Sequence, residues 1–171
     1  EALLDSQIDM AVHSTKDMPT TLPAGLMLNT FLKREDPRDA FISPQFNTID
    51  NLPKGAVVGT ASLRRRAQLL RVRNDLKVVN FRGNVQTRLN KLETTDITAT
   101  FLAVAGLNRL GLAQVITAAL SVDDFLPAPA QGAIAIEVRE SDDSTKDLLE
   151  SLHDQDTAIA VSAERALLKA L

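Results

Sequence analysis

Arginines and hydroxyl side chains gather at two points where an expected strand is followed by an expected helix. One is Gly59-Thr60-Ala61-Ser62-Leu63-Arg64-Arg65, and the other is Phe81-Arg82-Gly83-Asn84-Val85-Gln86-Thr87-Arg88. A guanidinium group donates paired hydrogen bonds in the geometry of a carboxylate or a phosphate, and the exposed N–H groups at a helix start also attract anions. Together the two points predict a site for an anionic ligand.

The position of Arg64 and Arg65 strengthens this interpretation. Both fall in the first turn of the expected helix, where the helix dipole disfavours each cation by ~0.3 to 1 kcal/mol. A bound anion would offset that penalty. The alternative is that Ser62 and Asn84 only cap their helices while the arginines only solvate a surface. We favour the ligand because two adjacent points carry the same pattern.

A third polar stretch, His13-Ser14-Thr15-Lys16-Asp17, follows another expected strand. An ionised Asp17 beside Lys16 has the chemistry to stabilise a developing cation or to transfer a proton. Its alternative role is that of a turn residue ahead of Pro19. His13 ends an apolar strand and is expected to be structural. With two well-separated histidines and no cysteine, the sequence predicts no metal site.

Composition limits the classes of protein that remain. The 171 residues are enough for one well-cored domain or one and a half small ones, and a hydrophobic content of 44% is that of a globular protein. The absence of cysteine excludes disulfides, thiolate metal ligands and a thiol nucleophile from these residues. The longest apolar runs, such as Phe101 to Ala105, are too short to span a membrane, and no secretory signal is expected.

Charge is distributed unevenly, although the net value is only −3. Residues 61–91 contain nine Lys or Arg and one acid, whereas residues 123–171 contain eleven acids and four bases. A basic patch confined to one stretch indicates a small anionic ligand more than nonspecific binding to duplex nucleic acid, which usually requires a basic footprint over a whole domain.

The expected elements alternate between short apolar strands and amphipathic helices. We expect strands at 8–13, 26–31, 40–42, 57–59, 76–81, 99–104 and 133–138, and helices at 62–73, 85–93, 105–110, 145–153 and 157–171. In the first helix, Leu63, Ala67 and Leu70 recur at helical spacing and predict its buried face. The alternation predicts an α/β fold with mainly parallel sheets flanked by helices. In such sheets ligands bind beyond the carboxyl ends of strands, where the three polar stretches lie.

Six motifs in order along the chain resemble the porphobilinogen deaminase family, also called hydroxymethylbilane synthase. They are His13-Ser-Thr-Lys-Asp-Met-Pro19, Arg34-Glu-Asp-Pro-Arg-Asp-Ala-Phe41, Val58-Gly-Thr-Ala-Ser-Leu-Arg-Arg65, Phe81-Arg-Gly-Asn-Val-Gln-Thr-Arg-Leu89, Leu102-Ala-Val-Ala-Gly-Leu107 and Pro129-Ala-Gln-Gly-Ala133. The resemblance covers the whole chain. It implies domains like type II periplasmic binding proteins, and an enzyme that condenses four porphobilinogen molecules with release of ammonia to give hydroxymethylbilane in tetrapyrrole (haem and chlorophyll) biosynthesis.

The resemblance also implies roles for individual residues. Asp17 would be the catalytic carboxylate, acting on the pyrrole nitrogens and on the cationic azafulvene left when ammonia leaves. The residues that match cofactor-binding and substrate-binding positions are Lys16, Thr60, Ser62, Arg64, Arg65, Arg82, Gly83, Asn84, Arg88 and Gln131. The cofactor would be a covalent dipyrromethane, attached to a cysteine that this chain does not contain. Two departures from the family pattern are Ala61, where a serine is usual, and Ile97-Thr98-Ala99, where many members have Tyr-Asp-Ala.

The resemblance divides the chain into parts of three domains. Residues 1–32 would be the carboxyl-side part of domain 1, residues 33–38 a hinge crossing and residues 39–126 the anion-binding α/β domain 2. Residues 127–153 would be the return crossing with a further segment of domain 1, and residues 154–171 the start of domain 3. We therefore expect a piece of a longer protein, inactive by itself. The full-length protein is expected to be a monomer with a small-molecule substrate and no nucleic acid or membrane partner, in the bacterial cytoplasm or, as the alternative, in a plastid.

Two other classes of function remain open from the residues. One is a nonenzymatic module of periplasmic-binding-protein type for a small anionic ligand, and the other is a nucleic-acid binder that uses Arg64 to Arg73. The Lys16-Asp17 pair favours the enzyme, because a receptor for anions has no need of a carboxylate beside its cationic site.

Overall fold

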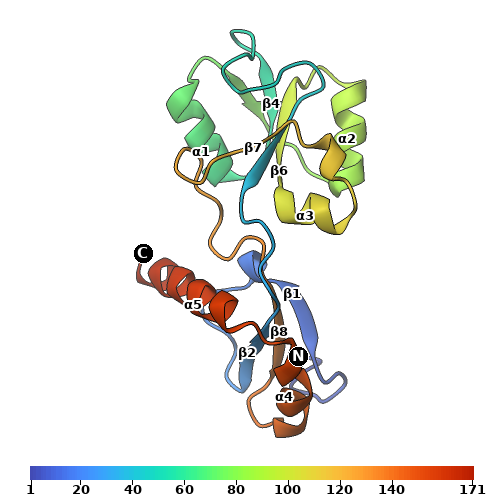
Figure 1. The fold of residues 1–171 in the computed structure, drawn as a ribbon, viewed down its shortest axis with the longest axis vertical. Helices are drawn as coiled ribbons and strands as arrows, with labels where there is room; N and C mark the ends of the chain where they lie inside the picture. Colours follow the sequence, from blue (N-terminus) through green and yellow to red (C-terminus); the bar gives the residue numbers. More distant parts are fainter. The chain divides into compact units, whose positions relative to one another are not determined.

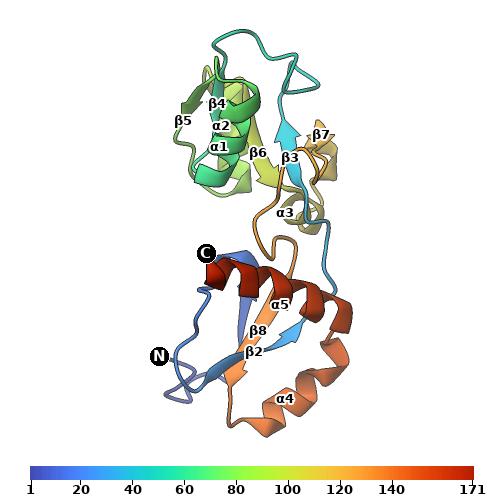
Figure 2. The ribbon, with the colours of Figure 1, turned by 90° about the vertical axis from the view of Figure 1, so that its left-hand side faces the viewer.

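The computed structural model describes residues 1–171, and these form two compact units. Unit 1 comprises Glu1–Pro37 and Ala128–Leu171, and unit 2 comprises Arg38–Pro127. The chain therefore leaves unit 1 once and returns to it once. Each unit has its own sheet and its own helices, as Figure 1 and Figure 2 show.

Unit 2 is built on a five-stranded sheet in the order β5-β4-β6-β3-β7. Its elements in chain order are β3 (Asp39–Ile42), β4 (Val57–Gly59), α1 (Leu63–Val72), β5 (Lys77–Val79), α2 (Val85–Thr94), β6 (Ala99–Ala103), α3 (Val104–Arg109), a 3-10 turn (Ala113–Val115) and β7 (Ala118–Ala119). Strand β4 lies between β5 and β6 and runs parallel to both. The carboxyl ends of these three strands therefore meet at one edge of the sheet.

Alternating side chains of the central strands of unit 2 pack into two layers. Phe41 of β3 and Phe101 of β6 face the layer of α1, where Leu69 is fully buried. Leu102, the next residue of β6, faces the opposite layer, where Leu92 of α2 is buried. Figure 1 shows α1 and α2 on opposite sides of this sheet. The period of two along a strand thus gives the sheet a hydrophobic core on each face.

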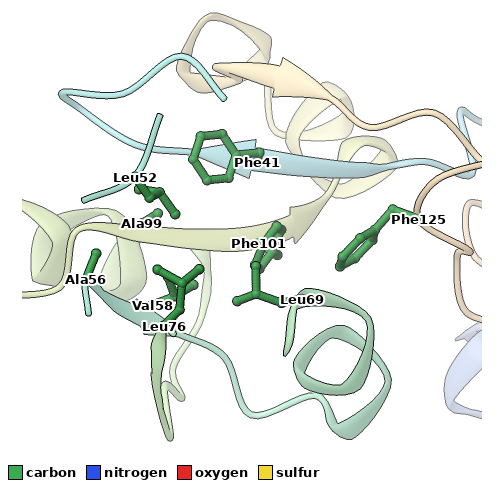
Figure 3. Packing of buried hydrophobic residues seen from close by; sticks show 9 residues of the cluster. All are labelled: Phe41, Leu52, Ala56, Val58, Leu69, Leu76, Ala99, Phe101 and Phe125. Atoms are coloured by element: carbon green, nitrogen blue, oxygen red, sulfur yellow. The ribbon is translucent and has the colours of Figure 1, made fainter. Parts of the chain in front are cut away.

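Phe101 is the centre of the aromatic packing in the layer of α1. Its ring centroid lies 5.9 Å from that of Phe41 and 5.2 Å from that of Phe125, with the latter pair inclined by only 17°. Figure 3 shows Leu69 of α1 packing beside Phe101 in the same cluster. Phe125 thereby anchors the segment that follows β7 onto the sheet.

Unit 1 is built on a three-stranded antiparallel sheet in the order β1-β8-β2. Its elements are β1 (Ala11–Ser14), a 3-10 turn (Thr15–Asp17), β2 (Leu26–Phe31), β8 (Ile134–Arg139), α4 (Asp143–Leu149), a 3-10 turn (Glu150–Leu152) and α5 (Gln155–Ala170). Figure 2 shows α5 lying across β8 and β2. Val161 of α5 packs with Phe31 and Ala135, whereas Leu149 of α4 packs with Ile136 and Val138. The two helices therefore cover opposite faces.

The observed elements lie close to the expected ones, but the strand directions differ in part. The expected strands at 26–31 and 57–59 coincide with β2 and β4, and the one expected at 8–13 begins only at Ala11. Parallel pairing is confined to β5, β4 and β6, and every other pair is antiparallel. Hydrophobic periodicity identifies a strand but not its direction, which the long connections decide. None of the helices combines the length and apolar content that crossing a bilayer requires.

Helix α1 buries a different face from the one that its apolar spacing predicts. Leu63 is 80% exposed and Ala67 is also exposed, whereas Arg65 and Leu69 are buried. The prediction that Leu63, Ala67 and Leu70 form the buried face of this helix is therefore wrong. Arg65 turns toward the sheet because a buried carboxylate accepts its hydrogen bonds there. Leu69, four residues further on, lies on the same face of the helix.

Gly59, the last residue of β4, lies against the ring of Phe81. A Cβ atom at this position would come within 2.7 Å of Cγ of Phe81 and 3.0 Å of its Cβ. Phe81 is 2% exposed and packs in the layer of α2. Only a residue without a side chain allows this approach between the end of β4 and the segment that follows β5.

We expect Gly59→Ala to destabilise the chain by about 1 to 3 kcal/mol, because the Phe81 ring would have to move within a packed core. Gly106→Ala is the matched control, since a Cβ on this α3 residue would meet nothing within 4 Å. Removing a helical glycine there should be neutral or stabilise by about 0.4 to 1 kcal/mol. Urea unfolding followed by circular dichroism measures both variants, and equal stabilities would contradict the packing argument.

Candidate functional site

The loops that follow β4 and β5 form a cavity of about 260 Å³ at the edge of the unit 2 sheet. The two strands are parallel neighbours, and the N–H of Thr60 donates to the carbonyl of Val79 at 3.0 Å. The residues that line the cavity are Thr60, Ala61, Ser62, Leu63, Arg66, Val78, Val79, Asn80 and Arg82. Three of the predicted binding residues, Thr60, Ser62 and Arg82, therefore share one cavity.

Ser62 and Asn84 cap the two helices that begin beside this edge. The Ser62 hydroxyl accepts a hydrogen bond from the backbone N–H of Arg65 at 3.4 Å, and the Asn84 side chain accepts from the N–H of Thr87 at 2.8 Å. The hydroxyl of Thr60 accepts from the N–H of Ser62 at 3.2 Å. Because the hydroxyl oxygens of Thr60 and Ser62 accept these hydrogen bonds, their hydroxyl protons stay available to a ligand. Capping and ligand binding are therefore compatible at these positions.

Arg64 and Arg65 share the buried carboxylate of Asp39, the first residue of β3. Asp39 is fully buried, and its Oδ1 accepts from Nε and Nη2 of Arg65 at 3.1 and 2.6 Å. Its Oδ2 accepts from Nη1 of Arg64 at 2.6 Å. Arg65 also donates from Nη1 to the carbonyl of Phe101 at 2.9 Å, and Arg64 donates to the carbonyl of Leu126. Asp39, a residue of the chain itself, therefore supplies part of the negative charge that offsets the two cations in the first turn of α1.

The ionisation of Asp39 follows from this pairing. Burial by itself would raise the pKa of the carboxyl, but the hydrogen bonds and positive charges of Arg64 and Arg65 outweigh it and lower the pKa below its ordinary value. Asp39 is therefore a fixed negative charge at neutral pH, and the two guanidinium groups are held by it.

The second polar loop holds Arg88 in a comparable way. Nε of Arg88 donates to the carbonyl of Gly83 at 2.8 Å. Burial, followed by the positive charge of Arg65, lowers the pKa of Arg88, which places the two guanidinium groups within electrostatic range. Gly83 has a φ of +133°, a conformation that favours glycine. Arg82 is exposed, and its side chain forms no hydrogen bond or ion pair.

Arg73, which also belongs to the basic stretch, stabilises a loop and does not lie at this edge of the sheet. Its guanidinium group donates to the carbonyls of Ile49, Asp50 and Leu52 and forms an ion pair with Asp75 at 2.8 Å. The hydrogen bond from Arg73 holds the pKa of the Asp75 carboxyl well below its usual range. Not every arginine of residues 61–91 is therefore available to a ligand.

Lys16, Asp17 and Gln131 belong to unit 1. Asp17 ends the 3-10 turn after β1 and is exposed, and its side chain forms no hydrogen bond or ion pair. Gln131 is 1% exposed; its Oε1 accepts from Nζ of Lys16 at 3.4 Å, and its Nε2 donates to the carbonyl of Pro37 at 2.7 Å. Nε of Arg34 donates to the carbonyl of Gln131 at 2.9 Å. Gln131 thus joins the segment that leaves unit 1 to the one that returns.

The predicted site residues therefore fall into two groups, each within one unit. Around the sheet edge of unit 2 lie Thr60, Ser62, Arg64, Arg65, Arg82, Gly83, Asn84 and Arg88, and in unit 1 lie Lys16, Asp17 and Gln131. Nε2 of His13 donates to Oε2 of Glu137 at 3.0 Å across neighbouring strands, as a structural histidine would. No group of three or more His, Asp or Glu side chains is arranged to hold a metal ion.

Sequence reasoning did not identify Asp39 or Arg66 as part of this edge. The only local signal for Asp39 is a single acid at the start of an apolar strand, Asp39-Ala40-Phe41-Ile42. That signal does not reveal its partners, which lie 25 and 26 residues further along the chain. Arg66 has the same residue type as the preceding Arg64 and Arg65, and only the structure places it, and not them, on the cavity.

Comparison with known proteins identifies a matching family and similar relatives. A family model described as porphobilinogen deaminase, dipyromethane cofactor binding domain, matches residues 1–147. The chain is 57% identical over 171 residues to the porphobilinogen deaminase of Paracoccus denitrificans, covering 100% of this chain and 55% of that protein. It is 56% identical over 171 residues to the chloroplastic porphobilinogen deaminase of Oryza sativa subsp. japonica, covering 100% of this chain and 48% of that protein. The chain thus spans about half the length of these relatives.

A solved structure supports the fold independently. An ABC transporter periplasmic substrate-binding protein from Coxiella burnetii matches with a TM-score of 0.54 at 16% identity, covering 95% of this chain and 78% of that one. At this identity the likeness concerns the fold alone. The expected α/β class, with periplasmic-binding-protein-like domains, is confirmed.

We expect Asp39→Asn to destabilise unit 2 by about 3 to 5 kcal/mol at pH 7, because two guanidinium groups would lose their buried counter-charge. The pKa of Asp39 is lower in the folded chain than in the unfolded one, so its contribution to stability is present above the unfolded pKa of about 3.9 and is lost as the pH falls through the folded value. The destabilisation caused by the substitution should therefore shrink below about pH 4.

Urea unfolding at a series of pH values measures this dependence, with circular dichroism as the signal because the chain has no Trp or Tyr. Asp96→Asn is the matched control, since Asp96 is an exposed acid of the same unit without a side-chain partner. A pH-independent difference between wild type and Asp39→Asn would show that the charge of Asp39 is not what stabilises the unit.

Proposed function

This chain belongs to the porphobilinogen deaminase family, and from that premise we propose that its protein is a porphobilinogen deaminase, or hydroxymethylbilane synthase. The reaction joins four porphobilinogen molecules head to tail, releases ammonia and yields hydroxymethylbilane for tetrapyrrole biosynthesis. The observation that carries the proposal is the concentration of cationic and hydroxyl side chains at one edge of unit 2. Each porphobilinogen ring bears an acetate and a propionate, so the ligand is the kind of polyanion that such an edge suits.

The donor groups at this edge fit carboxylate side chains. Arg64 uses only Nη1 on Asp39 and on the carbonyl of Leu126, which leaves its Nε and Nη2 hydrogens for a ligand. Asp39 fixes the plane of that guanidinium group before any ligand arrives, so less conformational entropy is lost on binding. When bound, the dipyrromethane would supply pyrrole rings with acetate and propionate side chains. At the edge of unit 2, Thr60, Ser62, Arg64, Arg65, Arg82 and Arg88 would hold those side chains. Lys16 is the residue of unit 1 that we propose to bind a carboxylate.

Asp17 is the residue we propose to act in the chemical step. Its exposed carboxylate has no side-chain partner in unit 1, so it is available to a substrate. Loss of ammonia leaves a positive charge on the pyrrole that a nearby carboxylate stabilises. At a separation of ~4 Å the attraction is roughly 4 kcal/mol for an effective dielectric constant near 20. The same carboxylate can accept hydrogen bonds from the pyrrole N–H groups as the charge develops.

The proposed organisation follows the family. Unit 1 would contain parts of domain 1, unit 2 would be domain 2, and the segment from residue 154 would begin domain 3. We propose that the full-length protein is a monomer that acts on porphobilinogen in the bacterial cytoplasm, with a plastid as the alternative compartment. The cofactor cysteine would lie in a part of the protein other than these 171 residues, which contain none.

The nonenzymatic alternative gains no support from the fold. Periplasmic-binding-protein-like domains would be present whether the anion is a substrate or only a ligand. The distinction lies in Asp17, which an anion receptor would not require beside Lys16.

We expect Asp17→Asn in the full-length protein to lower the rate of ammonia release from porphobilinogen by at least ~100-fold, the smaller end of the usual range for a general acid–base group. The melting temperature should stay the same, because the Asp17 side chain is exposed and forms no hydrogen bond. Asp5→Asn is the matched control, since it removes an exposed, unpartnered acid from the same unit. It should leave the rate unchanged.

Two results would count against the proposal in different ways. If Asp17→Asn kept a near-normal rate, the role of Asp17 would be refuted and the activity would stand. If the full-length wild-type protein released no ammonia from porphobilinogen, the proposed function itself would be wrong.

A further inference from the structure

The arginines near the sheet edge of unit 2 fall into two classes according to their partners. Arg64 and Arg65 are held by Asp39, and Arg88 is held by the carbonyl of Gly83. Arg66 and Arg82 are exposed, and their side chains form no hydrogen bond or ion pair. The side chains of the first class have partners within the chain, whereas those of the second have none.

Both unpartnered arginines line the same cavity. Arg66 reaches it from the first turns of α1, and Arg82 reaches it from the loop after β5. No acidic residue lines this cavity, which also contains the hydroxyl-bearing Thr60 and Ser62. Two like charges beside the N-terminal end of a ten-residue helix repel each other and are disfavoured by the helix dipole. An anion in the cavity would relieve both penalties.

The size of the cavity limits what the anion can be. Its volume of about 260 Å³ is just below the range of ~300 to 1,000 Å³ that holds drug-sized ligands. One ring with short carboxylate arms suits this space better than an extended polymer does. Paired N–H donors on two guanidinium groups match carboxylate oxygens in particular.

From these observations we propose that Arg66 is a further substrate-binding residue, which together with Arg82 holds a carboxylate arm of a pyrrole in this cavity. The proposal rests on the proposed function and extends it to a residue that the family resemblance did not mark. Arg66 acts through affinity, because it supplies charge and hydrogen bonds at the periphery of the ring and not at the reacting carbon. Its removal therefore changes binding, and changes the maximal rate much less.

The test uses the full-length protein and a pyrrole that carries one acetate and one propionate but no aminomethyl group. This probe cannot lose ammonia, so isothermal titration calorimetry reports its dissociation constant independently of turnover. We expect Arg66→Gln to weaken binding roughly three- to tenfold, the effect of losing one partly solvated charge-assisted contact. Arg66→Lys should retain part of the affinity, because it keeps the charge but not the planar pair of donors.

Arg71→Gln is the matched control. Arg71 lies on the same helix, is exposed, has no side-chain partner and does not line the cavity. The substitution removes the same charge, so a general electrostatic effect would lower affinity in both variants. We expect the Arg71→Gln protein to bind the probe as wild type does, and the affinity of wild type to fall more steeply with salt than that of Arg66→Gln.

The outcomes separate this proposal from the proposed function. Equal dissociation constants for Arg66→Gln and Arg71→Gln would overturn the role of Arg66, as would a wild-type protein that does not bind the probe. A wild-type protein that binds the probe but releases no ammonia from porphobilinogen would refute the proposed function. In that case the ratio of the dissociation constants of Arg66→Gln and Arg71→Gln would still decide whether Arg66 binds a carboxylate.

Discussion

The carboxylate of Asp39 is the charge around which the edge of unit 2 is organised. It is fully buried at the start of β3 and receives hydrogen bonds from both Arg64 and Arg65. A buried charge of this kind is tolerated only when it is paired. The pairing sets which face of α1 turns inward, brings Leu69 into the aromatic cluster, and leaves Arg66 on the solvent side.

The parallel trio of β5, β4 and β6 supplies the second constraint. Because their carboxyl ends meet, the loops that follow β4 and β5 are brought together although they are some twenty residues apart in sequence. Gly59 permits the contact by making room for the Phe81 ring. A cavity with hydroxyl groups, helix N–H groups and two unpartnered arginines forms at that edge. The same core contact between Gly59 and Phe81 that holds the two loops together therefore also positions the cationic groups at the cavity.

The basic stretch illustrates how one sequence feature serves several purposes. Residues 61–91 form one positively charged stretch of the sequence, yet their arginines have different partners in the structure. Arg65 is part of the core of unit 2, Arg73 fixes a loop through backbone carbonyls, and Arg66 and Arg82 face a cavity. The total charge of the stretch therefore overstates the number of guanidinium groups that are without a partner in the chain.

Local patterns in the sequence were enough to predict the helices and strands, the α/β class, the loops that carry polar residues and the family motifs. These depend on local periodicity, on capping residues and on residue types, which act over a few positions. Three features became visible only in the folded chain: Arg64 and Arg65 donate to Asp39, Leu63 is exposed, and several strand pairs are antiparallel. An ion pair between residues 25 or 26 positions apart depends on strand order and burial, and no local pattern of residue types encodes either of them.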